Sequence, residues 1–177
     1  MVGLRRGTVA LEPYDPTWPA AYRGEVDRLR QLVGKRIRRF EHVGSTAVEG
    51  LVAKPIIDLL GIVDTLDSAR TLVPVLEANA YEFRPNDPVP DRLFLAKGPR
   101  SRRTHYLRLA EPRSDTVREE LTFRDHLRTH PEDRAAYAEL KRRLAARYPD
   151  DREAYTAGKG PFIEGVLVEA NRSSQSR

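Results

Sequence analysis

The sequence predicts an α+β fold, in which helices pack on a small mixed β-sheet and the C-terminal region is helical. Residues 55–63 form an apolar run interrupted by Asp58, which is typical of a central strand covered on both faces. Apolar residues at helical spacing occur both before and after this run. The last third of the chain repeats that spacing in successive segments, so we expect it to be mostly helical.

The first part of the chain predicts a helix, a strand and a turn in succession. The helix is expected to begin after Thr17 and to end at Gly34, because apolar residues recur between them at helical spacing and glycine commonly follows a helix. Residues 36–43 alternate imperfectly between apolar and polar side chains and predict a strand. Gly44-Ser45-Thr46 ends that strand in a turn.

A second helix is predicted directly after the apolar strand. Its apolar stripe lies within residues 64–80, and Asp64 or Thr65 is the expected N-cap. Shorter β-type patterns follow, and the basic loop 97–103 is expected to join the last two as a hairpin. The three strands expected there are residues 81–84, 93–96 and 104–109.

Three helical segments are predicted in the C-terminal region. Ser114 is the expected N-cap of the first, Pro131 opens the second, and residues 161–171 form the last. Residues 172–177 are polar and are expected to be a disordered tail. The length of 177 residues suits one domain, which we place at residues 1–171.

Composition excludes several classes of protein. Hydrophobic residues are 40% of the chain, and no apolar run approaches the ~20 residues of a membrane-spanning helix, so no membrane association is expected. Cysteine is absent, which excludes disulfides, thiolate zinc sites and cysteine nucleophiles. The N-terminus has no secretion signal, and we expect a cytoplasmic protein.

The formal net charge of +5 favours an anionic partner such as a nucleotide, although an arginine-rich composition alone could also produce it. The most basic segment is the loop 97–103, which contains no acid. Proteins that stack on bases interleave aromatic and basic residues, and Tyr106 is the only aromatic residue close to this loop. Nucleic acid is therefore not the expected partner.

The most informative segment runs from residue 41 to residue 58. Gly44 allows the backbone to approach a ligand closely, and the N–H groups and hydroxyls of Gly44-Ser45-Thr46 can hold phosphate oxygens. Lys54 follows at the start of the next strand. Asp58 lies inside that apolar strand, where an ionised carboxylate is costly unless a cation or hydrogen-bond donors meet it. A divalent metal would satisfy it, and so would an arginine, a lysine or backbone N–H groups.

These residues resemble the GrpB (UPF0157) family. Residues 42–48 and 53–58 are similar to its central motif, and a Gly-Ser turn followed by a carboxylate on the next strand resembles the DNA polymerase β-like nucleotidyltransferases. The similarity extends over about residues 11–170. It includes Tyr14, Trp18, Pro19, His105, Phe123, Arg124, Asp125, Leu127, Arg128, Tyr137, Lys141, Tyr155, Lys159, Phe162 and Ile163.

The resemblance implies a minimal nucleotidyltransferase-like fold. It favours a metal-dependent transferase that uses Mg²⁺ and a nucleoside triphosphate, and that transfers an NMP group to a small acceptor. Asp58 would bind Mg²⁺, Gly44-Ser45-Thr46 would hold the terminal phosphates, and Lys54 would neutralise them. Because GrpB-like domains also occur fused to dephospho-coenzyme A kinases, the resemblance further implies a possible protein partner in coenzyme A metabolism.

One departure from the superfamily pattern opens an alternative. Active members carry a second carboxylate two residues after the first, and here that position is Leu60. Glu41 or Asp125 is a candidate for the missing metal ligand. The alternative is a non-catalytic module of the same fold that binds a nucleotide, a coenzyme A-related ligand or a partner protein.

Several other side chains are candidates for this site. Arg124 and Arg128 lie four residues apart on one predicted helix face, where they can bind phosphate by forked hydrogen bonds or pair with nearby acids. His105 is a candidate catalytic group if its face of the strand lines the cleft. Lys141 is a candidate phosphate ligand, and Lys159 is a similar one.

His126 and His130 also lie four residues apart, a spacing that can bind zinc. No third ligand is evident near them in the sequence. Zinc is therefore not expected there.

Overall fold

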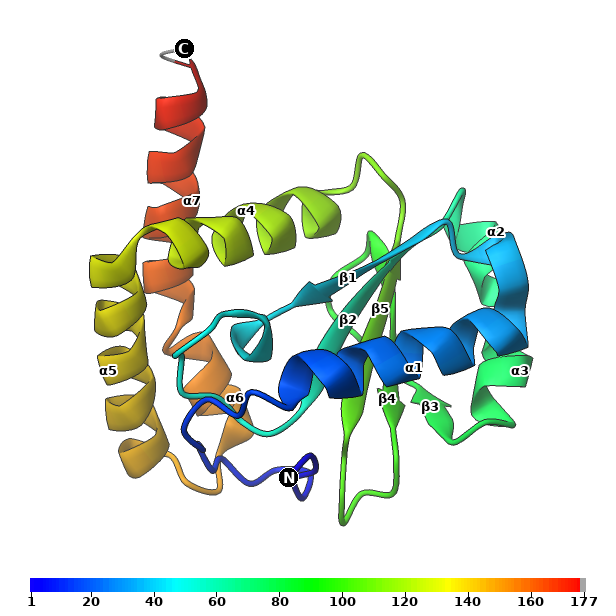
Figure 1. Ribbon diagram of the computed structural model, residues 1–177, viewed down its shortest axis with the longest axis horizontal. Coiled ribbons are helices and arrows are strands. Elements are labelled where there is room, and N and C mark those ends of the chain that lie inside the picture. Colours follow the sequence, from blue (N-terminus) through cyan, green and yellow to red (C-terminus); the bar gives the residue numbers. More distant parts are fainter. Residues whose placement is uncertain (176–177) are drawn as a thin grey trace.

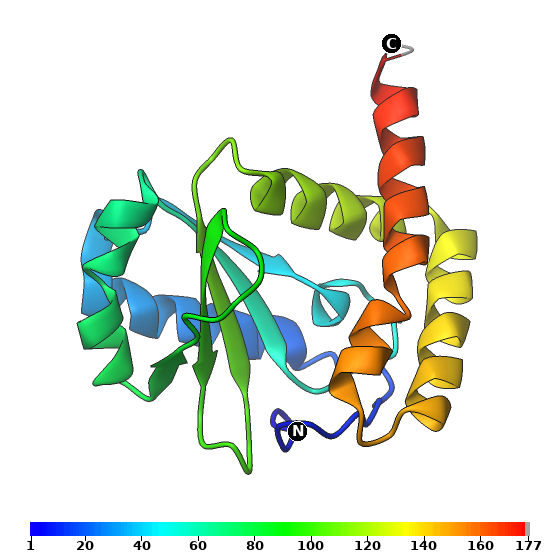
Figure 2. The ribbon, with the colours of Figure 1, turned by 180° about the vertical axis from the view of Figure 1, so that it is seen from behind.

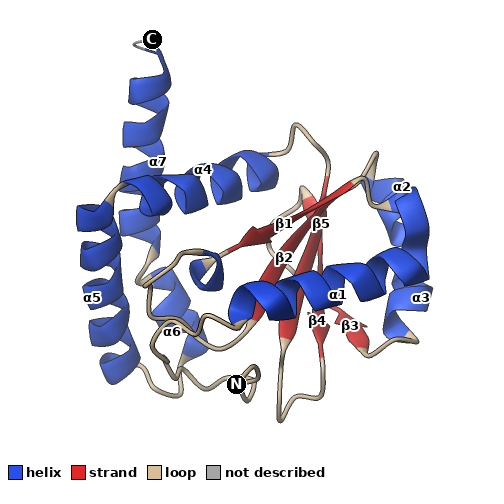
Figure 3. Cartoon of the chain, in the orientation of Figure 1, coloured by secondary structure: helices blue, strands red, loops and turns tan. Residues whose placement is uncertain are grey.

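The computed structural model describes residues 1–175 and confirms the α+β class. Five strands form one mixed sheet in the order β1-β2-β5-β4-β3 (Figures 1 and 3). The β2 and β5 strands pair in parallel, and the other three pairs are antiparallel. The strands are β1 (Arg39–Val43), β2 (Ile57–Ile62), β3 (Tyr81–Phe83), β4 (Arg92–Lys97) and β5 (His105–Ala110).

One face of the sheet forms the main hydrophobic core. The helices α1 (Trp18–Val33), α2 (Leu66–Arg70) and α3 (Val73–Glu77) cover this face (Figure 3). Leu59 and Leu107 point into the core from neighbouring strands, and both are fully buried. The continuous apolar run around Asp58 is therefore a central strand, as the sequence predicts.

The first helix ends at the predicted residue for the predicted reason. Gly34 follows α1 with φ of 60°, a conformation that glycine adopts at little cost. At the other end, Thr17 occupies the N-cap position without capping through its side chain, because its hydroxyl donates to Asp15 at 2.6 Å. The following strand begins later than predicted, since Gly34–Arg36 form a 3₁₀ turn.

The prediction of a single helix over residues 64–80 is wrong. Thr65 caps α2 and forms a reciprocal capping box with Ser68. The chain then breaks, and a second short helix begins with Pro74 in its first turn. Proline has no N–H to donate and its ring clashes with the preceding turn, so the α2 helix cannot continue through it.

On the opposite face, α4 (Asp115–Thr129) packs against the sheet through Val117 and Leu121. Figure 2 shows α4 and the helices that follow it gathered to one side of the strands. The Ser114 hydroxyl caps α4 by accepting a hydrogen bond from the N–H of Val117. The α5 helix (Pro131–Arg147) begins at the predicted proline. A short helix, α6 (Arg152–Ala157), was not predicted.

The last helix is longer than expected. The α7 helix (Gly160–Gln175) continues through residues 172–175, which the sequence assigns to a disordered tail. No glycine or proline interrupts these residues, so nothing in their backbone chemistry stops the helix. The last two residues of that tail, Ser176 and Arg177, lie outside the described residues. Within the described part, no helix is both long enough and apolar enough to cross a membrane.

Strand pairing decides which polar residues face α4. Asp58 pairs with Tyr106 and Leu60 with Arg108, so these four residues share one face of the sheet. His105 is the neighbour of Tyr106 and therefore points to the other face, toward α1. The sheet thus presents a polar patch on the side covered by the C-terminal helices.

The N-cap of α4 gives a first testable prediction. Replacing Ser114 by alanine removes the acceptor for the Val117 N–H and should lower the free energy of unfolding by about 1 kcal/mol. Urea unfolding measures the change. Ser101→Ala, in the exposed loop before β5, is the matched control and should change stability by less than about 0.5 kcal/mol. An equal loss in both variants would contradict the capping role.

Candidate anion-binding site

A cavity of about 250 Å³ lies between the polar patch of the sheet and the C-terminal helices. Gly44, Ser45 and Thr46 line one side, and Lys54 and Asp58 lie beside them, so the structure brings the central motif together. The remaining lining residues are Val48, Ile56, Tyr106, Arg108, Glu120, Phe123, Arg124, Leu127, Tyr137, Arg152, Tyr155, Thr156, Lys159 and Ile163.

The turn at Gly44 requires glycine for two reasons. Its φ is 70°, and a Cβ atom there would lie 2.7 Å from Oδ2 of Asp58. The turn continues into a short 3₁₀ helix, Ser45–Ala47. The exposed Gly44 backbone thus lies directly against the Asp58 carboxylate, as a close-approach motif requires.

Thr46 stabilises the turn from inside. Its Oγ1 lies 2.9 Å from Nε2 of His42, and the side chain is 1% exposed. His42 in turn stacks on Tyr22 with ring centroids 4.7 Å apart. Burial is the main cause that lowers the pKa of His42 to about 4, so the ring is neutral near pH 7. The Thr46 hydroxyl is therefore engaged with His42 rather than offered to the cavity.

Lys141, a predicted phosphate ligand, also holds the turn from behind. Its Nζ donates to Oγ of Ser45 at 2.9 Å and to the carbonyl of Val52, and the residue is 1% exposed. Burial first, and then the neighbouring Lys159 and Lys54, lower its pKa to about 6. Lys141 is absent from the cavity wall, so its contacts are those of a positioning residue.

Asp58 forms an ion pair with an arginine. Nη2 of Arg108 lies 3.0 Å from Oδ1 of Asp58, and Nε of Arg108 lies 3.2 Å from Oε1 of Glu120 on α4. A second arginine, Arg92, lies 3.5 Å from Glu120. Burial raises the pKa of Glu120, and Oε2 of that carboxyl has no hydrogen-bond partner among the described residues. Of the partners left open by the sequence, the structure supplies an arginine.

Three cations of the cavity wall have aromatic neighbours in place of acids. Nζ of Lys54 lies 5.4 Å from the centre of the Tyr155 ring, and Nζ of Lys159 lies 4.7 Å from it. Arg152 lies 5.2 Å above the Tyr106 ring. Within residues 1–175, no carboxylate forms an ion pair with any of these three side chains. Cation–π contacts stabilise them without neutralising their charge.

The lysines of the wall are strongly desolvated. Burial, followed by Lys159 and Arg152, lowers the pKa of Lys54 to about 7. Burial also lowers the pKa of Lys159 to about 8, although Asp58 opposes this effect. The wall has five cationic and two acidic side chains, and one of the five, Arg108, lies between both acids. The five are Lys54, Arg108, Arg124, Arg152 and Lys159, and the two are Asp58 and Glu120.

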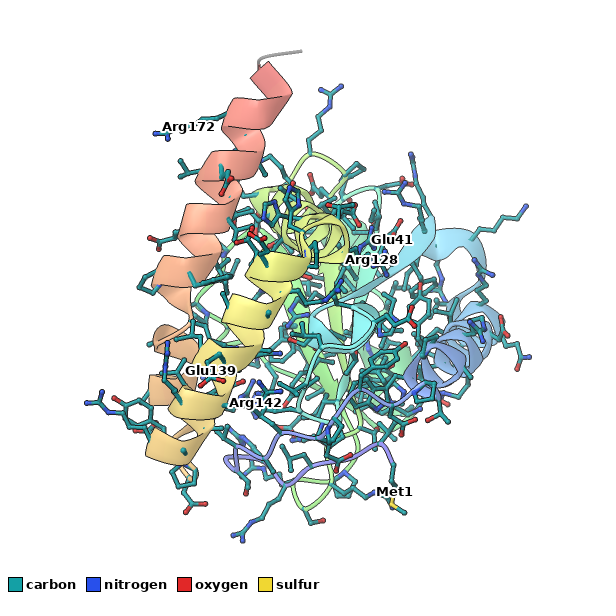
Figure 4. The ribbon with its side chains drawn as sticks, turned by 60° about the vertical axis from the view of Figure 1, so that its left-hand side comes forward. Met1, Glu41, Arg128, Glu139, Arg142 and Arg172 are labelled. Carbon is teal, nitrogen blue, oxygen red and sulfur yellow. The ribbon has the colours of Figure 1, made fainter. Side chains whose placement is uncertain are left out.

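The two arginines of the α4 motif have different positions. Arg124 lines the cavity, and its guanidinium contacts Glu41 Oε2 at 2.8 Å and Asp125 Oδ1 at 2.8 Å. Arg128 instead donates to the carbonyl of Ala47 at 3.0 and 2.8 Å, so it holds the turn without lining the cavity. In the view of Figure 4, the labelled side chains of Arg128 and Glu41 lie next to each other.

Glu41 and Asp125, the proposed replacements for the missing metal ligand, are thus both contacted by Arg124. Leu60 is fully buried in a small core with Val43 and Val117, so its position belongs to the packing between the sheet and α4. Among the described residues, no group of three or more close ligand side chains contains Asp58. These donors do not fit the converging carboxylates of a two-ion site.

His105, the predicted catalytic histidine, lies on the far face of the sheet. It pairs with Ile57, and its Nδ1 lies 3.0 Å from the hydroxyl of Thr104. Burial is the main cause that lowers its pKa to about 4. The alternation of β5 points Tyr106 and Arg108 into the cavity and His105 away from it.

Sequence reasoning missed three members of the wall. The alternation of β5 separates Arg108 from His105 in the sequence, but it does not tell which of the two faces lines the cavity. Glu120 and Arg152 gave no such signal, since charged helix residues usually face solvent. Tertiary packing of α4 and α6 against the sheet is what brings these two side chains to the cavity.

The family model described as "GrpB protein" matches residues 8–169 of this chain. A UPF0157 protein of Pseudomonas aeruginosa is 42% identical over 164 residues, which cover 89% of this chain and 66% of the relative. A dephospho-CoA kinase of Mycolicibacterium paratuberculosis is 33% identical in an alignment 195 residues long, gaps included. The alignment covers 94% of this chain and 47% of the kinase. The chain thus spans less than two thirds of each of these two relatives.

Among solved structures, the conserved protein GrpB from Enterococcus faecalis has a TM-score of 0.86 and 32% identity, covering 94% of this chain and 99% of that one. A more distant likeness is to the Cid1 poly(U) polymerase with MgGTP bound. Its TM-score is 0.49 and its identity 15%, covering 82% of this chain and 50% of the polymerase. A likeness this slight transfers no property to this chain.

Removing Arg108, which lies between the two acids, should destabilise the folded protein. Arg108→Met leaves Asp58 and Glu120 partly buried without their shared cation, and we expect the free energy of unfolding to fall by about 3 kcal/mol. Arg38→Met is the matched control, because its partner Asp64 and Arg38 itself are both largely exposed and should contribute less than about 1 kcal/mol. Urea unfolding compares the two variants. Similar small losses would show that Arg108 does not neutralise the site.

The buried lysine behind the turn gives a pH prediction. Because the pKa of Lys141 falls from 10.5 to about 6 on folding, the unfolded chain binds more protons between these values, and the free energy of unfolding rises with pH. For one lysine this slope is at most about 1.4 kcal/mol per pH unit. Lys141→Met should therefore flatten the rise in stability between pH 7 and pH 9, measured by urea unfolding.

Two features make that measurement specific. Lys54 and Lys159 contribute slopes of the same sign, so the variant should keep part of the rise. Lys35→Met, at an exposed position, should keep all of it. An unchanged slope in Lys141→Met would mean that Lys141 is charged in the folded protein at pH 7.

Proposed function

The chain belongs to the GrpB family, and we propose that its cavity binds a nucleotide through the phosphates, using side-chain cations in place of a pair of metal ions. The observation that carries this proposal is the charge of the cavity wall. Five cationic side chains face two carboxylates, and three of the cations have no acidic partner among the described residues. Uncompensated cations in a partly buried cavity attract a polyanion, because the low local dielectric strengthens the attraction.

The turn and the cations would contribute to binding in different ways. Gly44 and Ser45 offer backbone N–H groups and one hydroxyl at close approach. Lys54, Lys159 and Arg152 would neutralise the phosphate charge from the opposite side. A bound phosphate would also favour the protonated form of both lysines, which burial disfavours in its absence.

A second cavity supports a nucleotide rather than a free phosphate ion. It measures about 940 Å³ and shares Arg152 and Thr156 with the first cavity. Phe83 and Phe94 also line it, and its charged lining consists of five carboxylates and three arginines, which suits an uncharged nucleoside better than a further phosphate. Cavities of roughly 300–1,000 Å³ are typical of sites for whole small-molecule ligands. The first cavity would hold the phosphates, and the adjoining one would hold the nucleoside.

Binding alone agrees better with these contacts than the transferase favoured by the sequence. Asp58 is neutralised by Arg108, and the carboxylates do not converge as a pair of Mg²⁺ ions requires. The non-catalytic module is therefore the preferred form of the proposal. The similarity to a dephospho-CoA kinase adds coenzyme A and dephospho-coenzyme A to the candidate ligands, and a coenzyme A-pathway protein to the candidate partners.

Thermal-shift measurements test the proposal directly. The full chain is titrated with the four nucleoside triphosphates, coenzyme A and dephospho-coenzyme A, each with Mg²⁺ and with EDTA. A ligand at one hundred times its dissociation constant stabilises the native state by ~2.7 kcal/mol. We expect at least one nucleotide to stabilise the protein in EDTA. Lys54→Met should weaken that ligand at least about tenfold, because a charge-assisted phosphate contact contributes about 1.5–3 kcal/mol.

Lys35→Met is the matched control, since it removes the same charge from an exposed position and should leave affinity unchanged. Stabilisation that appears only with Mg²⁺ would instead support the metal-dependent transferase. No stabilisation by any nucleotide or coenzyme would overturn the proposal.

A further inference from the structure

Three helices outside the cavity bring potential metal ligands together. His126 lies on α4, Asp133 on α5 and Glu169 on α7. One ligand atom from each of these side chains lies within 4.8 Å of the others. We call this group the three-helix junction. The sequence shows no third ligand for His126, because Glu169 is distant in the chain and reaches the junction only through the packing of α7.

The histidine of the junction is held in place before any ion arrives. His126 is 6% exposed, and its Nε2 lies 2.6 Å from Oδ2 of Asp133. Its ring stacks on His130 with centroids 3.9 Å apart and an interplanar angle of 6°. His130 is itself fixed, because its Nδ1 lies 3.0 Å from the carbonyl of His126. A ligand whose ring orientation is fixed in advance loses less entropy when it binds an ion.

We propose that the three-helix junction binds a divalent transition metal such as Zn²⁺. Imidazole nitrogen and carboxylate oxygen are both donors that Zn²⁺ accepts, and three protein ligands leave its fourth position open to water. Mg²⁺ prefers oxygen donors and is not expected there. Zn²⁺ would take the Nε2 lone pair, and the proton between His126 and Asp133 would move to Nδ1 of the ring or to solvent.

The position of the junction suggests what the ion would do. The ion would link α7 to the junction of α4 and α5, close to Pro131, where α5 begins. The α7 helix starts directly after Lys159, a member of the cavity wall. None of the three ligands of the junction lines either cavity, so the ion would stabilise the helical region without touching the proposed nucleotide, and the two sites are tested separately.

Calorimetric titration of the full chain with Zn²⁺ tests this inference, and Co²⁺ absorption in the visible range reports the coordination geometry. We expect one Zn²⁺ per chain in a buffer that contains neither phosphate nor nucleotide. Glu169→Gln should weaken binding at least about tenfold, and His126→Gln should abolish it. Glu164→Gln, also exposed and on α7, is the matched control and should bind as the unmodified chain does.

Glu169 is exposed, so its variant keeps the inference testable even if His126→Gln fails to fold. Circular dichroism checks the folding of each variant. Absence of Zn²⁺ binding by the unmodified chain would overturn the inference, and so would equal affinities for Glu169→Gln and Glu164→Gln. Nucleotide stabilisation of Glu169→Gln in EDTA should be unchanged, so failure of one proposal leaves the other standing.

Discussion

The ion pair between Asp58 and Arg108 is the interaction on which the rest of the site depends. The two residues lie on adjacent parallel strands, and the register that pairs Leu60 with Arg108 lets the guanidinium reach Asp58 on the same face. The same guanidinium contacts Glu120, so it also ties α4 to the sheet. An isolated carboxylate in this strand would be costly to bury. With Arg108 beside it, β2 can carry Asp58 and still lie inside the sheet, between β1 and β5.

With the two acids neutralised by Arg108, and Arg124 paired with Glu41 and Asp125, three cations of the wall remain without an acidic partner among the described residues: Lys54, Arg152 and Lys159. Lys54 and Lys159 both keep lowered pKa values because burial disfavours their charged forms, and the Tyr155 ring is the contact that the two share. Such lysines reduce the stability of the empty protein, and a bound anion restores their favoured charge state. Under the proposed function, the arrangement would exchange some stability for affinity, as binding sites commonly do.

The central motif and the succession of strand, turn and strand along the chain were predictable because they are local. A turn after a strand, a glycine at close approach and an aspartate inside an apolar run can each be recognised in the sequence. The choice between the two faces of β5 could not be made in this way, since both faces carry apolar residues, and His105 was assigned to the wrong one. The prediction of one helix over residues 64–80 rested on the apolar stripe and did not take account of Pro74, which begins the second short helix. Glu120 and Arg152 reach the cavity only through tertiary packing.

Leu60, in place of the second carboxylate, removes a metal ligand and also changes the surroundings of that position. This residue is fully buried with Val43, Ile62, Ala110 and Val117, so a carboxylate there would meet apolar neighbours instead of solvent or an ion. Arg108 adds a cation beside the one remaining carboxylate of the pair, where a metal would need further negative charge. Both features act in the same direction, since each makes the site less suited to cations and more suited to anions. The charge of the wall, the buried leucine and the glycine turn are therefore all consistent with the proposed site, which would hold phosphate without metal ions.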